Sequence, residues 1–82
     1  MVEFKRAYEF TNDWASYKAE AETRETHTGY GNDTALEVML ENDKGLYMEP
    51  LRFDLRYTGI GTPDEVDEFV REQLAKRFAA RF

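Results

Sequence analysis

The residue types best suited to catalysis or metal binding are few in this chain, and their spacing does not bring them together. Serine and histidine occur once each, as Ser16 and His27, and cysteine is absent. A nucleophilic triad would have to join these two residues, yet no nucleophile-elbow motif surrounds Ser16. A metal centre would need His27 together with Glu25 and Asp33, and no zinc-type spacing enforces that. We therefore predict a non-enzymatic chain with no catalytic residue, no metal site and no cofactor.

A glycine-containing segment, Gly59-Ile60-Gly61-Thr62-Pro63, leads into a predicted helix, where free N–H groups and the helix dipole attract anions. Carboxylates follow directly at Asp64, Glu65, Asp67 and Glu68, and they repel a phosphate. Pro63 also removes one donor, and the longer glycine fingerprints are missing. The segment is therefore predicted to be a strand-to-helix turn with a good cap.

The segment Gly29-Tyr30-Gly31-Asn32-Asp33 is the first candidate for binding a partner. Its tyrosine is amphipathic and stands between two glycines, a combination common in contact surfaces on loops. We predict Tyr30, Asn32 and Asp33 as binding residues. The alternative is an ordinary hairpin loop in which Tyr30 folds back on the core.

Arg52 and Arg56 are the second candidate, because they share one face of a predicted strand. Asp54 stands between them, so the alternative is that both arginines form ion pairs instead of binding a ligand.

Arg77 falls within the apolar stripe of the predicted helix. Its stem is expected to pack while its guanidinium reaches solvent at the sheet edge.

Length and charge set the class of protein. The chain has 82 residues, of which 17 are acidic and 11 basic, giving a formal net charge of −6. This charge disfavours nucleic acids and anionic membranes as direct partners.

The hydrophobic fraction of 41% favours a folded chain, and 82 residues suffice for one small domain, residues 1–82, with no deep catalytic cleft. No apolar run is long enough to span a membrane and the first residues form no secretory signal, so we expect a cytoplasmic protein.

The strongest predicted element is a helix over residues 63–80. Thr62-Pro63-Asp64-Glu65 matches a capping box with proline in the first helical position. The apolar residues that follow recur every three or four positions and form one stripe: Val66, Phe69, Val70, Leu74 and Phe78.

Alternating apolar and polar residues predict strands over residues 2–10, 36–41 and 51–57. Arg6 interrupts the apolar face of the first. The apolar positions are even before Pro50 and odd after it, and a proline cannot donate to a ladder. We therefore predict a bulge or a break at Pro50, on a segment accessible at the sheet edge.

The stretch from 14 to 27 fits either a strand or a helix, and the strand is favoured because Tyr17, Ala19, Ala21 and Thr23 alternate with charged residues. The predicted fold is α+β: an antiparallel four-stranded meander, β-β-β-β-α, with one C-terminal helix packed on one face. The alternative has a helix in place of the second strand. Such a fold predicts one solvated sheet face of mixed charge. Because one helix covers two or three strands, it also predicts that part of the apolar face stays open, where a second copy or a partner would bind.

From these features we expect a small, acidic, soluble domain that binds another protein, or itself, through the open sheet surface and the Tyr30 loop. The alternative hypothesis is an acidic inhibitor that mimics a nucleic acid and blocks a nucleic-acid-binding protein. Its motivation is the negative charge. Its weakness is the scatter of lysines and arginines among the acids.

Overall fold

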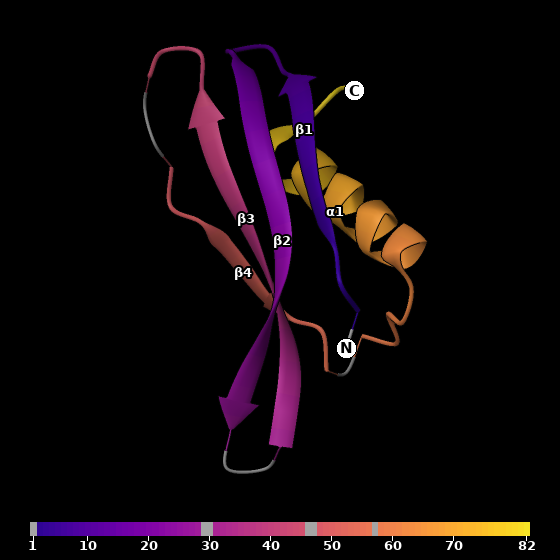
Figure 1. Cartoon of the computed structure of the whole chain (residues 1–82). Helices are drawn as coiled ribbons and strands as arrows, with labels where there is room; N and C mark the ends of the chain where they lie inside the picture. The colour runs from indigo at the N-terminus through magenta and orange to yellow at the C-terminus, as the bar shows by residue number, and fades with distance from the viewer. Residues whose placement is uncertain (1, 29–30, 46–47, 57) are drawn as a thin grey trace.

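A computed structural model describes residues 2–28, 31–45, 48–56 and 58–82, with only the backbone described at 26–28 and 31–33. Four strands precede one helix (Figure 1): β1 (Lys5–Thr11), β2 (Ser16–Thr28), β3 (Gly31–Asn42), β4 (Leu51–Asp54) and α1 (Pro63–Phe78). The predicted α+β class and the β-β-β-β-α order are confirmed.

The sheet is an antiparallel meander in the order β1-β2-β3-β4. Strand β2 pairs with β1 over seven positions and with β3 over twelve, so the helical alternative for residues 14–27 is wrong. Local propensity leaves that choice open. The two flanking ladders decide it, because a strand at this place satisfies backbone groups on both sides.

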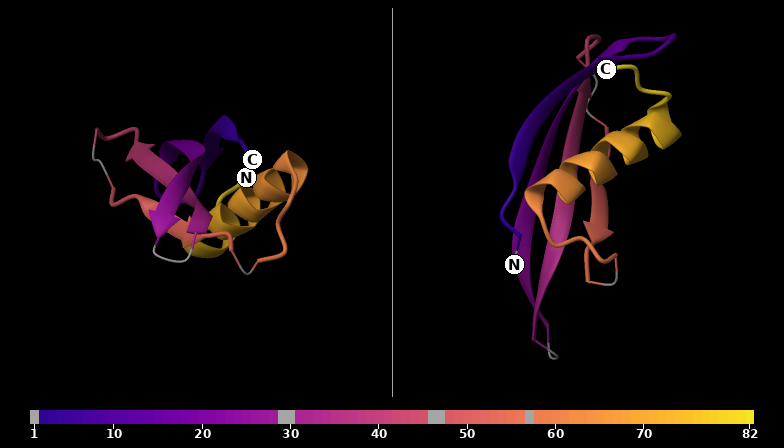
Figure 2. Two further views of the ribbon diagram at one scale, coloured as in Figure 1. Left: turned by 60° about the horizontal axis from the view of Figure 1, so that its bottom comes forward. Right: turned by 90° about the vertical axis from the view of Figure 1, so that its right-hand side faces the viewer.

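The hydrophobic core lies between one face of the sheet and α1 (Figure 2). Along α1, the residues at the centre of the predicted stripe are fully buried: Val66, Val70 and Leu74. They meet sheet residues that alternate along each strand, including Ala21 on β2 and Leu36 on β3. The opposite face of the sheet carries no helix, as predicted, and its side chains are mostly charged.

The strand ends differ from the sequence prediction at several places. Strand β1 spans 5–11 instead of the predicted 2–10. Strand β3 begins at Gly31, which lies within the predicted loop 29–33. The predicted strand 51–57 ends at Asp54, with Tyr57 outside the described residues. The predicted break at Pro50 is confirmed, because β4 begins immediately after it.

The ladder is irregular at this break. Continuing the β3–β4 register would place Glu49 opposite Leu40, yet the Met48 N–H donates to the Leu40 carbonyl at 3.3 Å. A one-residue offset of this kind is the mark of a bulge.

The predicted N-cap is present at the start of α1, and the Glu65 carboxylate reaches back to it. This carboxylate accepts from the Gly61 N–H at 3.2 Å and from the Thr62 hydroxyl, instead of from the Thr62 N–H of a full capping box. The Thr62 hydroxyl accepts from the Glu65 N–H at 3.3 Å, and Pro63 occupies the first turn. The helix ends at Phe78, two residues before the prediction, because Ala79 adopts the left-handed conformation with φ 52°. This conformation usually falls to glycine, since an L side chain is strained there.

We predict that Ala79→Gly raises the free energy of unfolding by about 1 kcal/mol, because glycine adopts a positive φ without strain. Urea denaturation followed by circular dichroism measures the change. Ala80→Gly is the matched control, since Ala79 is the only non-glycine residue with positive φ in the described part of the chain. Equal stabilisation by both changes would contradict the explanation.

Arg6, the charge that interrupts the apolar face of β1, is accommodated by an acidic residue on α1. Its Nη1 lies 3.2 Å from Oδ1 of Asp67, while the Arg71 Nε lies 3.1 Å from Oδ2. The buried Tyr8 hydroxyl donates to the same carboxylate at 2.6 Å. Asp67 therefore joins the outer flank of the helix to β1.

Burial and the hydrogen bond to Asp67 raise the pKa of Tyr8 far above its ordinary value of 10.0. Burial alone would raise the pKa of Asp67, but hydrogen bonds from Tyr8 and Arg71 and the charges of Arg71 and Arg6 lower it. The raised pKa of Tyr8 and the lowered pKa of Asp67 both favour a neutral tyrosine that donates to an ionised carboxylate.

This contact predicts a loss of stability at high pH. Above about pH 10 Tyr8 ionises in the unfolded chain but keeps its proton in the folded one, so the free energy of unfolding falls as pH rises. Denaturation between pH 8 and about pH 11 tests this. A Tyr8→Phe variant has no such group to titrate and should show a shallower fall; identical slopes would refute the assignment.

Candidate interaction surfaces

The outer edge of β4 is the first candidate surface, and it carries Arg52. In an antiparallel ladder, successive residues turn their backbone groups alternately toward and away from the neighbouring strand. The Leu55 N–H donates to the Thr34 carbonyl of β3 at 3.0 Å, so the odd-numbered residues of this run face the sheet. The backbone N–H and C=O groups of Arg52 and Asp54 therefore face outward. No other strand pairs with this edge in the described part of the chain.

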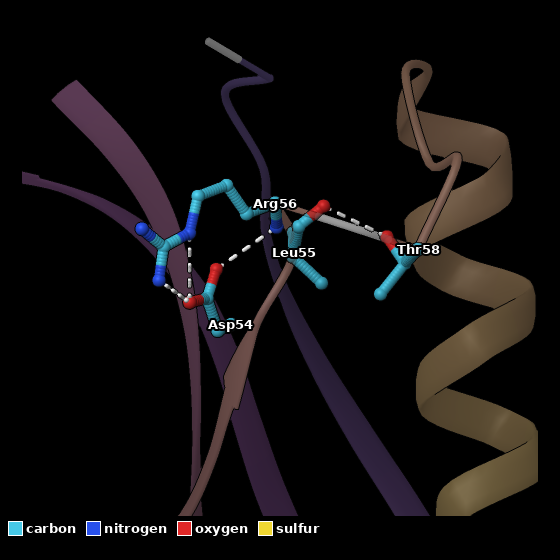
Figure 3. Close-up of polar contacts among 4 residues, drawn as sticks. All are labelled: Asp54, Leu55, Arg56 and Thr58. Carbon is cyan, nitrogen blue, oxygen red and sulfur yellow. Dashed lines mark hydrogen bonds and ion pairs between the residues drawn. The ribbon is translucent and has the colours of Figure 1, made fainter. Parts of the chain in front are cut away.

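A polar turn ends β4 directly after Asp54 (Figure 3). One carboxylate oxygen accepts from the Arg56 N–H at 2.9 Å, and the other accepts from the Arg56 guanidinium at 2.7 Å. The Thr58 hydroxyl donates to the Leu55 carbonyl at 2.9 Å, which links two residues that directly follow the strand. At the point where the strand ends, the Asp54 side chain therefore binds a backbone N–H that a longer strand would turn outward.

The two arginines predicted as binding residues are both in ion pairs, as the alternative expectation had it. Arg52 lies 3.1 Å from Glu37 of β3, and Arg56 pairs with Asp54. The Arg52 side chain is nevertheless 76% exposed and stands at the open edge. The two arginines do not line one common site. Arg52 pairs with Glu37 on β3, whereas Arg56 pairs with Asp54 at the end of its own strand.

The opposite edge of the sheet, along β1, is more enclosed. At its end, Thr11 and Arg81 exchange two backbone hydrogen bonds of 3.2 and 2.9 Å. The Arg81 guanidinium also pairs with Asp13. Asp67 of α1 contacts Arg6 and Tyr8, and α1 lies toward the β1 side of the sheet (Figures 1 and 2).

The β2–β3 hairpin extends beyond its neighbours and forms a two-stranded arm (Figure 1). The arm comprises residues 24–28 and 31–35. Among the described residues, its base is bordered by the end of β4, through the Ala35–Asp54 pair and the bond from the Leu55 N–H to the Thr34 carbonyl. Two of the predicted binding residues fall on it. Asn32 pairs with His27 in the backbone ladder and Asp33 with Thr26, while Tyr30 lies outside the described residues.

The uncovered sheet face has an apolar centre that sequence reasoning missed. Met39 on β3 is 50% exposed and lines a shallow hollow of about 370 Å³ together with Ala7, Met48 and Pro50. Charged groups border the hollow, including Lys18 of β2. The strand pattern places Met39 on the solvent face. It does not show which other apolar residues lie beside Met39, so the patch could not be predicted from the sequence.

A second, larger hollow of about 680 Å³ lies where β1, β2 and the C-terminal residues meet. Phe10 and Tyr17 stack at its wall, with ring centroids 4.9 Å apart, and Phe82 completes the apolar lining. Trp14, in the turn between β1 and β2, is 74% exposed. Sequence reasoning did not single out this end of the molecule, because its aromatic residues come from distant parts of the chain.

Arg77, on α1, turns its guanidinium toward β4 and over an aromatic ring, instead of toward solvent alone as predicted. Its guanidinium carbon lies 5.5 Å from the Phe53 ring centroid and its Nε donates to Gln73 at 3.2 Å, while the residue stays exposed.

Comparisons with protein-family models, with curated proteins and with solved structures found no match for this chain. Within the described residues, no group of three or more histidine and acidic side chains could hold a metal ion. In the same part of the chain, no helix has the length and apolar character to cross a membrane.

The turn after β4 makes a direct prediction about Asp54. Hydrogen bonds from the Arg56 backbone and side chain lower the pKa of this carboxyl below its ordinary value of 3.8. Carbon-detected NMR titration should therefore show Asp54 losing its proton at a lower pH than a free aspartate. In an Arg56→Ala variant the side-chain bond is lost, and we expect the pKa to rise; an unchanged pKa would contradict the contact.

Proposed function

We propose that this chain is a non-enzymatic protein-interaction module that binds its partner on the uncovered face of the sheet. The observation that supports this most directly is the apolar hollow around Met39. A half-exposed methionine with Ala7, Met48 and Pro50 beside it forms a small apolar patch within a charged face. Exposed apolar patches with a polar rim are typical of protein-binding sites, and methionine adapts to varied partner surfaces.

The charges around this patch support a protein partner more than a nucleic-acid-like role. Lys18 stands between Glu9 and Glu41 in the strand register, and Lys5 pairs with Glu20 at 3.4 Å. Positive and negative side chains are therefore interspersed on this face, although Glu22 and Glu37 stand opposite each other, whereas a mimic of nucleic acid needs one sign over a continuous surface. No observation favours the acidic-inhibitor alternative, and we do not propose it.

The arm extends the sheet beyond the body of the domain. Past the end of β4, no strand among the described residues pairs with either of its outer edges. An edge of this kind can pair with an extended segment of a partner. The proposed role of Tyr30, Asn32 and Asp33 is to contact the partner at the end of this arm.

The patch is tested by Met39→Asp in pull-downs with tagged protein, followed by titration with each recovered partner. A charge at the centre of the patch should weaken binding about tenfold or more, because a carboxylate would be buried there without a partner. Thermal unfolding should change little, since Met39 lies outside the core.

Trp14→Asp is the matched control, because it places the same charge on another exposed apolar residue, in the turn between β1 and β2. Loss of binding in this variant, with Met39→Asp unaffected, would move the site to that turn. Tyr30→Ala measures the share contributed by the arm. Equal binding by all three variants and by the original protein would refute the proposed surface.

A further inference from the structure

The open β4 edge is built so that it can pair with a copy of itself. We propose that two copies of this chain associate through β4, antiparallel about a two-fold axis at Phe53, to form one continuous eight-stranded sheet. This inference deepens the proposed interaction role and rests on it, since it names one partner for one edge of the sheet.

The direction of the backbone groups sets the register. Arg52 and Asp54 point their N–H and C=O groups outward, so they are the residues that can exchange hydrogen bonds with another strand. A two-fold axis at Phe53 places Arg52 of each copy opposite Asp54 of the other. Each of these pairs can exchange two backbone hydrogen bonds, and Phe53 stands opposite itself between them.

Charge is complementary in this register and on this face. Arg52 carries a positive and Asp54 a negative side chain, both exposed and on the same side of the strand. Opposite charges facing one another across antiparallel strands stabilise the pair, whereas like charges destabilise it. With the existing Glu37–Arg52 and Asp54–Arg56 pairs, the contact forms a row in which positive and negative groups alternate across the axis.

The apolar side of β4 also suits a second copy. Phe53 is partly buried and meets Phe69 of α1 edge-on, with ring centroids 5.1 Å apart. Leu51 is partly buried on the same face, and the register places it opposite Leu55 of the second copy. The two helices would lie on one face of the joined sheet, with a pair of Phe53 rings between them.

The β1 edge is a poorer choice for such pairing, although Lys5 and Glu9 are also of opposite charge there. Thr11 at the end of this edge is already bonded to Arg81. The flank of α1 that carries Asp67 also lies over β1, where it contacts Arg6 and Tyr8. A second sheet added at β1 would meet this helix, whereas the outer edge of β4 has no bridging segment among the described residues.

The test is sedimentation velocity on the untagged chain from micromolar to millimolar concentration, with reciprocal charge changes. The unaltered protein should form a reversible dimer. Arg52→Asp and Asp54→Arg should each weaken self-association about tenfold or more, because both place like charges opposite one another twice. Circular dichroism checks that each variant remains folded.

Mixing the two variants is the decisive step. In the mixed pair every position 52 faces an opposite charge at position 54, so the proposal predicts a heterodimer where each variant alone is monomeric. Lys5→Glu is the control for the β1 edge and should leave the dimer intact. Failure of the mixture to associate, dissociation by Lys5→Glu, or a monomeric unaltered protein would overturn the proposal.

The two proposals fail separately. A monomeric protein whose partner binding is still abolished by Met39→Asp would remove the dimer and leave the interaction role standing. A dimer that follows the charge rules, with no effect of Met39→Asp on any other partner, would leave the β4 contact as the only supported interaction.

Discussion

The arrangement of this domain depends on the burial of one face of a four-stranded sheet by a single helix. Val66, Val70 and Leu74 form the only fully buried line along α1, and the sheet residues beneath them are almost all apolar. A single helix cannot cover both faces of a sheet, so the second face must be stable in water on its own. Its cross-strand charge pairs follow from that requirement.

The same constraint makes the two sheet edges unequal. The helix lies toward β1, where Asp67 reaches Arg6 and Tyr8, and the chain after the helix returns to bond with Thr11. On β4, the Phe53 ring contacts Phe69 and Arg77 of α1. Both edges carry outward backbone groups and opposite charges, but the edge farther from the helix is the one where nothing described in the structure stands in the way of a second strand.

Much of the fold could be predicted from local patterns. The N-cap at Thr62 and the apolar stripe of α1 are properties of adjacent residues, and the change of parity at Pro50 located the break before β4. The choice between strand and helix for residues 14–27 could not be made in this way. It depends on ladders with β1 and β3, which no local window contains.

The candidate surfaces were less predictable, for the same physical reason. Arg52 and Arg56 were identified from strand alternation, but the bond from the Arg56 N–H at the end of β4 depends on how the Asp54 side chain turns. Met39 and Ala7 are separated by many residues and meet only through the register of β1, β2 and β3. The Tyr8–Asp67 bond likewise joins the first strand to the helix across most of the chain.

The bridge between Thr11 and Arg81 has a consequence for the order of folding. The β2–β3 hairpin is made of contacts between neighbours in sequence, whose loop-closure entropy is small, so it is expected to form early. The bridge joins the first strand to the segment after the helix, and it can close only when the helix has docked. The bridge is therefore expected to form last. Slow hydrogen exchange at the Thr11 amide would then report that the whole domain, and not the hairpin alone, is folded.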